Sequence, residues 1–167
     1  MTTNPIPQPN SGAIVSEGLM PPGTCVGLDA QFEAPGAKQP APAIPRALRI
    51  LLLDDDVHFA KALKQFFERM GHHPAVAHRG CEAMRLLEDQ RFHVALVDID
   101  LPDTTGFKVM ADALAQGKLR GTKIIFCSGD GSEERVAMAG EFPGSRFLPK
   151  PFDLKDLSEL IRQILQS

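Results

Sequence analysis

The sequence of 167 residues has no excess of positive charge, few cysteines and no long apolar run. Its 18 basic residues are outnumbered by 21 acidic ones, whereas a general nucleic-acid binder needs a basic surface. The three scattered cysteines suit a reduced protein better than a disulfide framework. No apolar run approaches the ~18 residues of a membrane span, and the N-terminus lacks the pattern of a secretory signal. We therefore expect a cytoplasmic protein that neither binds nucleic acid nor inserts into a membrane.

Residues 1–46 differ in composition from the rest of the chain. They hold nine of the 14 prolines and only five charged residues, with no helical or strand period. Such a segment cannot bury enough apolar area to offset the entropy lost on ordering. We predict a disordered, proline-rich tail over residues 1–46 and a folded domain over residues 47–167. Met20 is a second candidate for the start of translation.

From Ala47 onward, short apolar runs alternate with amphipathic stretches. Strands are predicted over residues 49–53, 74–77, 94–97, 123–127 and 147–148. A helical stretch follows each strand; Asp56 is placed to cap the first helix, Gly71 to end it, and Asp153 to cap the last. Five strand–helix units in about 120 residues imply an α/β fold with a doubly wound parallel sheet. His72 and His73 are predicted to lie in a solvated turn between the first helix and the second strand.

Polar side chains follow four of the five predicted strands. The acidic run 54–56 follows the first strand, Asp98 ends the third, Ser128 follows the fourth and Lys150 follows the fifth. Because the carboxyl ends of parallel strands meet at one edge of the sheet, these side chains should lie together. Each of them alone is an ordinary loop residue. Together, at successive strand ends, they indicate a site.

The residue types at this edge suit phosphoryl transfer. Crowded carboxylates repel one another unless a cation lies among them, and Mg²⁺ prefers such oxygen ligands. A carboxylate can also attack phosphorus and form an aspartyl phosphate. The reaction needs mainly positioning and charge neutralisation. Mg²⁺, the ammonium group of Lys150 and the hydroxyl of Ser128 can together hold the three phosphoryl oxygens.

Residues 47–167 resemble the receiver domain of two-component response regulators. Asp98 is followed by Pro102 four residues later and by Gly106 eight residues later, and a Lys-Pro-Phe sequence follows the fifth strand. The matching segments are residues 51–56, 96–106, 124–129 and 147–152. The resemblance implies a flavodoxin-like fold, with a five-stranded parallel sheet in the order 2-1-3-4-5 and five helices.

The resemblance also implies roles for residues at the phosphorylation site. Asp98 resembles the phosphoacceptor, Ser128 the hydroxyl residue and Lys150 the phosphate-binding lysine. The Lys150–Pro151 peptide bond corresponds to one that is usually cis in this family. Phe147 corresponds to the aromatic switch residue and would act with Ser128. One departure is Pro149, which removes an N–H group from the end of the fifth strand.

The same resemblance implies a magnesium site. Asp55 corresponds to the principal metal-binding carboxylate, and Asp54 orients it or binds through water. Asp98 and the backbone carbonyl of Asp100 complete the implied ligand set. Asp100 and Asp130 each lie two residues past a site residue, at positions that tune the lifetime of the phosphoryl group in this family.

The function implied is that of a single-domain response regulator, which is a signalling protein and not a conventional enzyme. A sensor histidine kinase or a histidine phosphotransferase would supply the phosphoryl group. Since no DNA-binding pattern is present, output would come through contact with a downstream protein, or the chain would serve as a relay or phosphate sink. The cofactor implied is Mg²⁺.

Two alternatives remain open from the sequence alone. A receiver-like module that binds proteins without being phosphorylated usually lacks a site residue, and none is missing here. A haloacid-dehalogenase-type phosphatase shares the Asp98-Ile99-Asp100 pattern. That family, however, places its nucleophile after the first core strand and needs an acidic metal-binding motif after the lysine.

Removal of residues 1–45 is expected to leave the folded domain and its phosphorylation intact. A proline-rich segment of low charge and little apolar content should pack little against the domain. The melting temperature should therefore shift by no more than a few degrees, which corresponds to less than ~1 kcal/mol in a domain of this size. Thermal unfolding of the full chain and of the truncated chain measures this directly. A much larger loss would mean that the tail stabilises the domain.

Overall fold

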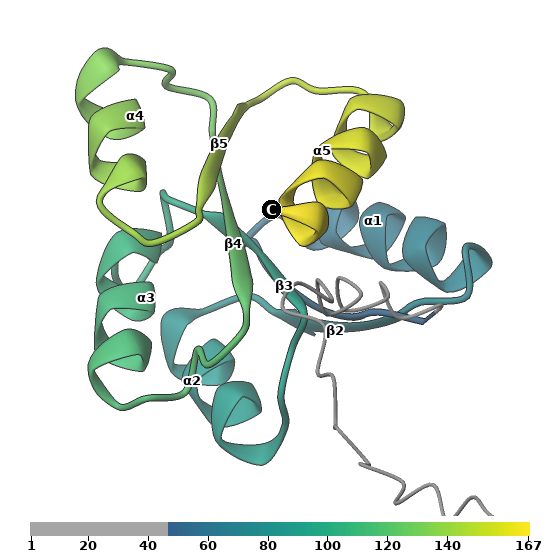
Figure 1. Ribbon diagram of the computed structural model, residues 1–167, viewed down its shortest axis with the longest axis horizontal. Coiled ribbons are helices and arrows are strands. Elements are labelled where there is room, and N and C mark those ends of the chain that lie inside the picture. The colour runs from purple at the N-terminus through teal and green to yellow at the C-terminus, as the bar shows by residue number, and fades with distance from the viewer. Residues whose placement is uncertain (1–46) are drawn as a thin grey trace, which may run out of the picture. The chain divides into compact units, whose positions relative to one another are not determined.

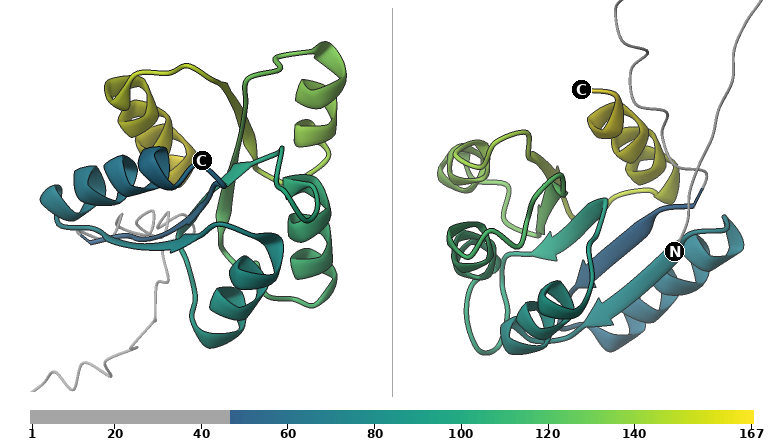
Figure 2. Two further views of the ribbon diagram at one scale, coloured as in Figure 1. Left: turned by 180° about the vertical axis from the view of Figure 1, so that it is seen from behind. Right: turned by 60° about the horizontal axis from the view of Figure 1, so that its bottom comes forward.

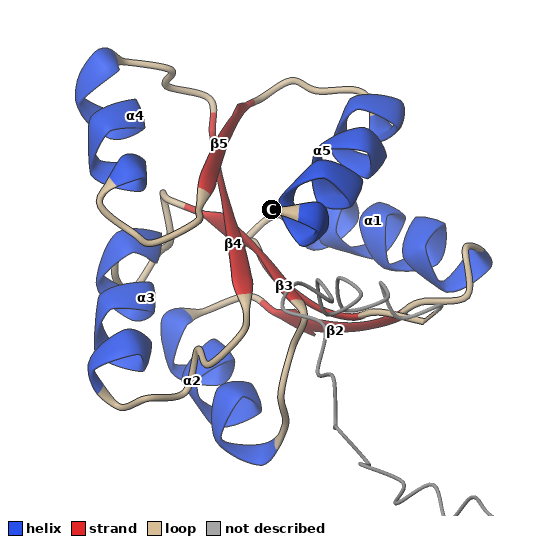
Figure 3. Ribbon diagram, in the orientation of Figure 1, coloured by secondary structure: helices blue, strands red, loops and turns tan. Residues whose placement is uncertain are grey.

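The structure, a computed structural model, describes residues 47–167, and the tail predicted over residues 1–46 lies outside the described residues (Figure 1). The strands are β1 (Arg49–Leu53), β2 (His73–Ala77), β3 (Val94–Asp98), β4 (Lys123–Ser128) and β5 (Arg146–Pro149). The helices are α1 (Val57–Arg69), α2 (Gly80–Asp89), α3 (Gly106–Ala115), α4 (Glu133–Gly140) and α5 (Leu154–Gln166). Strands and helices alternate strictly along the described chain (Figure 3).

All strand pairs are parallel, and the sheet order is β2-β1-β3-β4-β5. The predicted flavodoxin-like order 2-1-3-4-5 with five helices is thus confirmed. Helices α1 and α5 cover one face of the sheet, and α2, α3 and α4 cover the other (Figures 1 and 2). The chain is doubly wound, and β1 and β3 lie at the centre, where the direction of winding reverses.

The side chains of β1 divide between two hydrophobic clusters. Leu51 and Leu53 belong to the cluster beneath α2, α3 and α4, whereas Ile50 and Leu52 belong to the cluster beneath α1 and α5. This alternation follows from the two-residue period of a strand. Since both faces of β1 and β3 are covered, their sequences are almost continuously apolar.

The helix ends agree with the predictions except at one cap. Asp56 accepts hydrogen bonds from the backbone N–H groups of His58 and Phe59 and caps α1. Gly71 follows α1 with φ of +80°, a conformation that glycine adopts without strain. Asp153 occupies the N-cap position of α5, but its side chain makes no capping hydrogen bond. The prediction of a side-chain cap at Asp153 was therefore wrong.

The predicted solvated turn at His72 and His73 was wrong in part, because His73 is exposed but belongs to β2 and His72 is half-buried. His73 is the first residue of β2, and its backbone N–H donates to the carbonyl of Leu48 at 2.7 Å. His72 is half-buried, and its Nδ1 accepts from the backbone N–H of Leu48 at 3.4 Å. Its ring centroid lies 6.2 Å from that of Phe67. Tertiary contacts with β1 and α1 order both residues.

The turn from β3 to α3 brings Gly106 against the backbone of Asp98. A Cβ atom on Gly106 would lie 2.7 Å from Cγ1 of Val97 and closer still to the carbonyl oxygen of Asp98. The N–H group of Gly106 donates to the carbonyl of Ile99 at 2.9 Å, which closes the turn. A side chain at residue 106 would therefore displace the strand end that carries Asp98.

None of the helices among residues 47–167 combines the length and the apolar character that crossing a membrane requires.

Substitution of Gly106 by alanine is expected to destabilise the domain by about 1–3 kcal/mol, the usual cost of overpacking. Gly140→Ala is the matched control, because nothing lies within 4 Å of a Cβ at that position in α4. Urea unfolding of both variants measures the difference in the free energy of unfolding. Equal stability of Gly106→Ala and the parent chain would show that the turn relaxes without cost.

Candidate functional site

Three carboxylates converge at the carboxyl edge of the sheet, and we call Asp54, Asp55 and Asp98 the acidic site. Asp98 is the last residue of β3, and Asp54 and Asp55 directly follow β1. One carboxylate oxygen from each lies within 4.8 Å of the others. Asp54 and Asp98 are buried, whereas Asp55 is exposed. The pairing of β1 with β3 places these residues side by side, although 44 positions separate Asp54 from Asp98.

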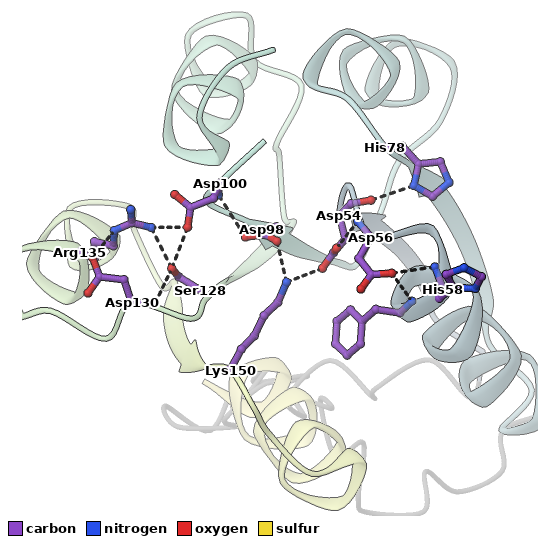
Figure 4. Close-up of polar contacts among 11 residues, drawn as sticks. Asp54, Asp56, His58, His78, Asp98, Asp100, Ser128, Asp130, Arg135 and Lys150 are labelled. Atoms are coloured by element: carbon purple, nitrogen blue, oxygen red, sulfur yellow. Dashed lines mark hydrogen bonds and ion pairs between the residues drawn. The ribbon is translucent and has the colours of Figure 1, made fainter. Parts of the chain in front are cut away.

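Lys150 bridges two of these carboxylates (Figure 4). Its Nζ donates to Oδ2 of Asp98 at 2.6 Å and to Oδ2 of Asp54 at 2.7 Å. The residue follows β5, where its backbone N–H donates to the carbonyl of Ser128 at 2.7 Å. The Lys150–Pro151 peptide bond is cis. Nζ also lies 5.0 Å from the ring centroid of Phe59, within the range of a cation–π contact.

Burial and charge compete in this part of the site. Burial raises the pKa of Asp54, and its hydrogen bond and charge interaction with Lys150 offset only part of that rise. Burial alone would lower the pKa of Lys150, but its hydrogen bonds to Asp54 and Asp98 outweigh burial and raise the pKa. Lys150 is therefore a stable cation at neutral pH. The rise in the pKa of Asp54 reflects chiefly the removal of its carboxylate from water.

The donor set of the acidic site fits Mg²⁺. It consists of carboxylate oxygens from Asp54, Asp55 and Asp98, the hard ligands that Mg²⁺ prefers. Asp55, the most exposed of the three, has no side-chain hydrogen bond within the described part of the chain. Its carboxylate is thus free to contact a cation from the solvent side. The Asp100 backbone carbonyl, the fourth expected ligand, lies two residues after Asp98. The Oδ1 atom of Asp98 accepts from the Asp100 N–H at 3.1 Å.

A second group of polar side chains lies beside Asp98, and we call Asp100, Ser128, Asp130 and Arg135 the polar cluster (Figure 4). The hydroxyl of Ser128, at the end of β4, is fully buried and donates to Oδ2 of Asp100 at 3.1 Å. Arg135 of α4 forms ion pairs with Asp100 at 2.6 Å and with Asp130 at 3.0 Å. The hydrogen bond from Arg135 lowers the pKa of Asp100. Ser128 thus lies one strand away from Asp98 and is linked to it through Asp100.

The predicted switch residue Phe147 lies in β5, three residues before Lys150. It pairs in register with Phe126 of β4 and packs, half-buried, against the cluster beneath α2, α3 and α4. Ala139, the buried residue of α4, belongs to the same cluster. A movement of the Phe147 ring would therefore change the packing beneath α4.

Two residues of the site were missed by sequence reasoning. Arg135 lies in a helix of mixed composition, and nothing in its local pattern indicates two acidic partners from other loops. The only available signal was its position seven residues after Ser128, in the first turns of the helix that follows β4. His78, after β2, was given no role because the histidines of the sequence show no ligand spacing, and its Nδ1 lies 2.8 Å from the carbonyl oxygen of Asp54.

The profile of the response regulator receiver domain family matches residues 50–162 of the chain. The chain belongs to this family. The transcriptional regulatory protein CpxR of Escherichia coli strain K12 is 35% identical over 118 residues, which are 71% of this chain and 49% of CpxR. The chain therefore spans about half the length of this curated relative. The matched range includes every residue of the acidic site and of the polar cluster, and Lys150. The match is to receiver domains, so the phosphatase alternative is set aside.

Solved structures share the receiver fold. The CheY-like receiver domain protein of Methanospirillum hungatei JF-1 superposes with a TM-score of 0.66 at 30% identity, covering 71% of this chain and 94% of that one. The response regulator TrrA of Thermotoga maritima, solved with Mg²⁺ and beryllofluoride, has a TM-score of 0.60 and covers 70% of this chain and 98% of TrrA. At 21% identity the second likeness shows the fold alone. A phosphorylated aspartate and Mg²⁺ at an acidic pocket are typical of this receiver family.

Proposed function

We propose that this chain accepts a phosphoryl group on Asp98 in a magnesium-dependent reaction. The observation that carries the proposal is the position of Asp98. Its carboxylate ends a central buried strand, lies beside Asp54 and Asp55, and is hydrogen-bonded to Lys150. A carboxylate fixed between a cation-binding pair and an ammonium group suits nucleophilic attack on an anionic phosphoryl group.

The residues of the site divide the work of the reaction. An oxygen of Asp98 attacks phosphorus, and the bond between phosphorus and the donor atom breaks, so that the donor leaves with its electron pair. Lys150 turns from Asp98 and Asp54 to the negative oxygens of the new phosphoryl group. The hydroxyl of Ser128, on the neighbouring strand, donates to another of those oxygens. Positioning and charge neutralisation supply most of the rate acceleration in such transfers.

Asp54, Asp55, Asp98 and the carbonyl of Asp100 would hold Mg²⁺, which supplies further positive charge opposite the phosphoryl oxygens. A sensor histidine kinase or a histidine phosphotransferase would be the phosphoryl donor. We propose residues 47–167 as the phosphoacceptor unit. Output would pass to a downstream protein by phosphorylation-dependent contact, or the chain would act in a relay or as a phosphate sink.

Asp98→Asn is expected to abolish phosphorylation, because an amide cannot serve as the attacking carboxylate. Incubation of the parent chain with acetyl phosphate and Mg²⁺ should add one phosphoryl group, seen as about 80 Da by intact-protein mass spectrometry and removed by hydroxylamine. Asp89→Asn, which changes an exposed carboxylate of α2, is the matched control and should label like the parent chain. EDTA should prevent labelling of the parent chain and of Asp89→Asn.

Labelling of Asp98→Asn at the parent rate would contradict the assignment of the phosphoacceptor. Equal labelling with and without EDTA would contradict the role of Mg²⁺. If the folded parent chain accepts no phosphoryl group from acetyl phosphate or any histidine donor, the chain is a receiver-like module that acts without phosphorylation.

We further propose that Ser128 and Phe147 carry the signal from the phosphoryl group to the surface. Phosphorylation adds negative charge and acceptor oxygens beside β4. The hydroxyl of Ser128 would be drawn toward them, and the ring of Phe147 would change rotamer in the space next to β4 and α4. Moving such an equilibrium from 1:99 to 99:1 needs about 5.5 kcal/mol of differential interaction. The rotation of a single ring does not supply this free energy, so backbone changes in β4 and α4 would contribute to the shift.

Ser128→Ala is expected to accept a phosphoryl group on Asp98, more slowly than the parent chain, and to lose most of its phosphorylation-dependent change in conformation. Amide chemical shifts of α4 and β5, recorded with and without beryllofluoride and Mg²⁺, measure this change. Ser158→Ala, which removes a hydroxyl that donates to the carbonyl of Leu154 within α5, is the control. Identical shift changes in Ser128→Ala and in the parent chain would rule out Ser128 as the link.

A further inference from the structure

No step of the proposed reaction uses Arg135, the only cation of the polar cluster. Its Nη1 donates to Oδ2 of Asp100 at 2.6 Å and to Oγ of Ser128 at 2.8 Å. Its Nε lies 3.0 Å from Oδ2 of Asp130. One guanidinium group thus joins the loop after β3, the end of β4 and the loop after β4 (Figure 4). The side chain is 26% exposed, whereas those of its two acidic partners are more than half exposed.

The contacts of Ser128 fill its hydrogen-bonding capacity. A hydroxyl has one hydrogen to donate and two lone pairs to accept with. The hydrogen of Ser128 is directed to Asp100, and its lone pairs accept from Arg135 and from the backbone N–H of Asp130 at 3.0 Å. The hydroxyl can donate to a phosphoryl group on Asp98 only if it leaves Asp100. Because the hydrogen and the two lone pairs keep fixed tetrahedral directions, the hydroxyl turns to a new acceptor only by giving up one accepted bond, and the bond from Arg135 is kept when the one from the Asp130 N–H is lost.

The charges around Asp98 give Arg135 a second effect. Asp100 and Asp130 add two negative charges beside the acidic site, which already holds three carboxylates and one ammonium group. An incoming phosphoryl group is itself an anion and would be repelled by an uncompensated Asp100. Once Ser128 has turned away, the Asp100 carboxylate keeps Arg135 as its partner. The guanidinium group therefore compensates the carboxylate closest to Ser128 both before and after the reaction.

Helix α4 depends on Arg135 for its attachment to the site. Ala139 is the only buried residue of this eight-residue helix, and Val136 and Met138 are exposed. Arg135 is the half-buried residue in its first turns, and among the described residues its contacts supply the side-chain ion pairs of the helix. A change at Ser128 or Asp100 is thus transmitted to α4 through a direct contact.

We propose that Arg135 is a positioning residue for phosphorylation, which compensates the charge of Asp100 and holds Ser128 within reach of the phosphoryl group on Asp98. The proposal rests on the function proposed above. The charge of Arg135 favours the phosphorylated state because it cancels repulsion between Asp100 and the phosphoryl oxygens. Its bond to Ser128 favours that state because the hydroxyl stays ordered while it rotates.

The test is the affinity of the chain for beryllofluoride in the presence of Mg²⁺, a stable substitute for the phosphoryl group. Since the chain has no tryptophan or tyrosine, the titration is followed by fluorine NMR or calorimetry. Arg135→Ala should weaken binding by about fivefold, the upper range for a part-exposed ion pair. Arg135→Lys, which retains the charge, should recover part of the loss. Arg85→Ala removes an exposed arginine from α2 and should leave the affinity unchanged.

A double-mutant cycle separates charge compensation from a general structural effect. In the Arg135→Ala background, Asp100→Asn removes the carboxylate that lost its partner, and the affinity should return to within about twofold of the parent value. The difference between Arg135→Ala and the parent chain should also shrink as the salt concentration rises, because salt screens exposed charges. A loss caused by misfolding would show neither rescue nor salt dependence.

Parent-level affinity in Arg135→Ala, or a double variant as weak as Arg135→Ala, would overturn the proposal while leaving phosphorylation of Asp98 intact. A folded parent chain that binds no beryllofluoride and accepts no phosphoryl group would overturn the proposed function and this inference with it. The Asp98→Asn variant distinguishes the two cases, because it should lose beryllofluoride binding whatever the role of Arg135.

Discussion

The contact between Lys150 and the carboxylates of Asp54 and Asp98 is the interaction on which the site depends. Two buried carboxylates at the end of adjacent strands would repel each other, and removal from water adds to their cost. The ammonium group compensates both at distances of 2.6 and 2.7 Å. Burial nonetheless raises the pKa of Asp54, because the contact with Lys150 offsets only part of the cost of removing the carboxylate from water. Three carboxylates face one ammonium group, and the Mg²⁺ proposed for the site would balance this excess of negative charge.

The parallel sheet supplies the geometry for this contact. β1 and β3 are buried on both faces, which holds their carboxyl ends rigidly beside each other. Lys150 follows β5, at the edge of the sheet. One strand, β4, lies between β3 and β5 and sets the distance that the lysine side chain spans to reach Asp98. The turn at Gly106 keeps α3 close to the end of β3 without a side chain in the way. Core packing therefore determines where the charged groups stand.

The polar cluster extends the site toward a helix that the core holds only weakly. Asp98 contacts Lys150 on one side and, through its bond from the Asp100 N–H, the cluster on the other. Ser128 and Arg135 continue this chain of contacts to α4. Asp98 is thus linked on one side to Lys150 and on the other to a network of side chains that ends at α4. The signal proposed to pass from Asp98 to α4 would follow these contacts.

The sequence by itself determined the fold and the residues at the strand ends. Apolar runs of strand length, amphipathic helices and capping residues such as Asp56 are local signals, and the carboxyl-edge rule then brings Asp54, Asp98 and Lys150 together. Only the tertiary structure decided the place of His72, the unbonded side chain of Asp153 and the contacts of Arg135. These depend on which loops and helices approach one another across the sheet. No local pattern encodes that approach, because it follows from the packing of the whole domain.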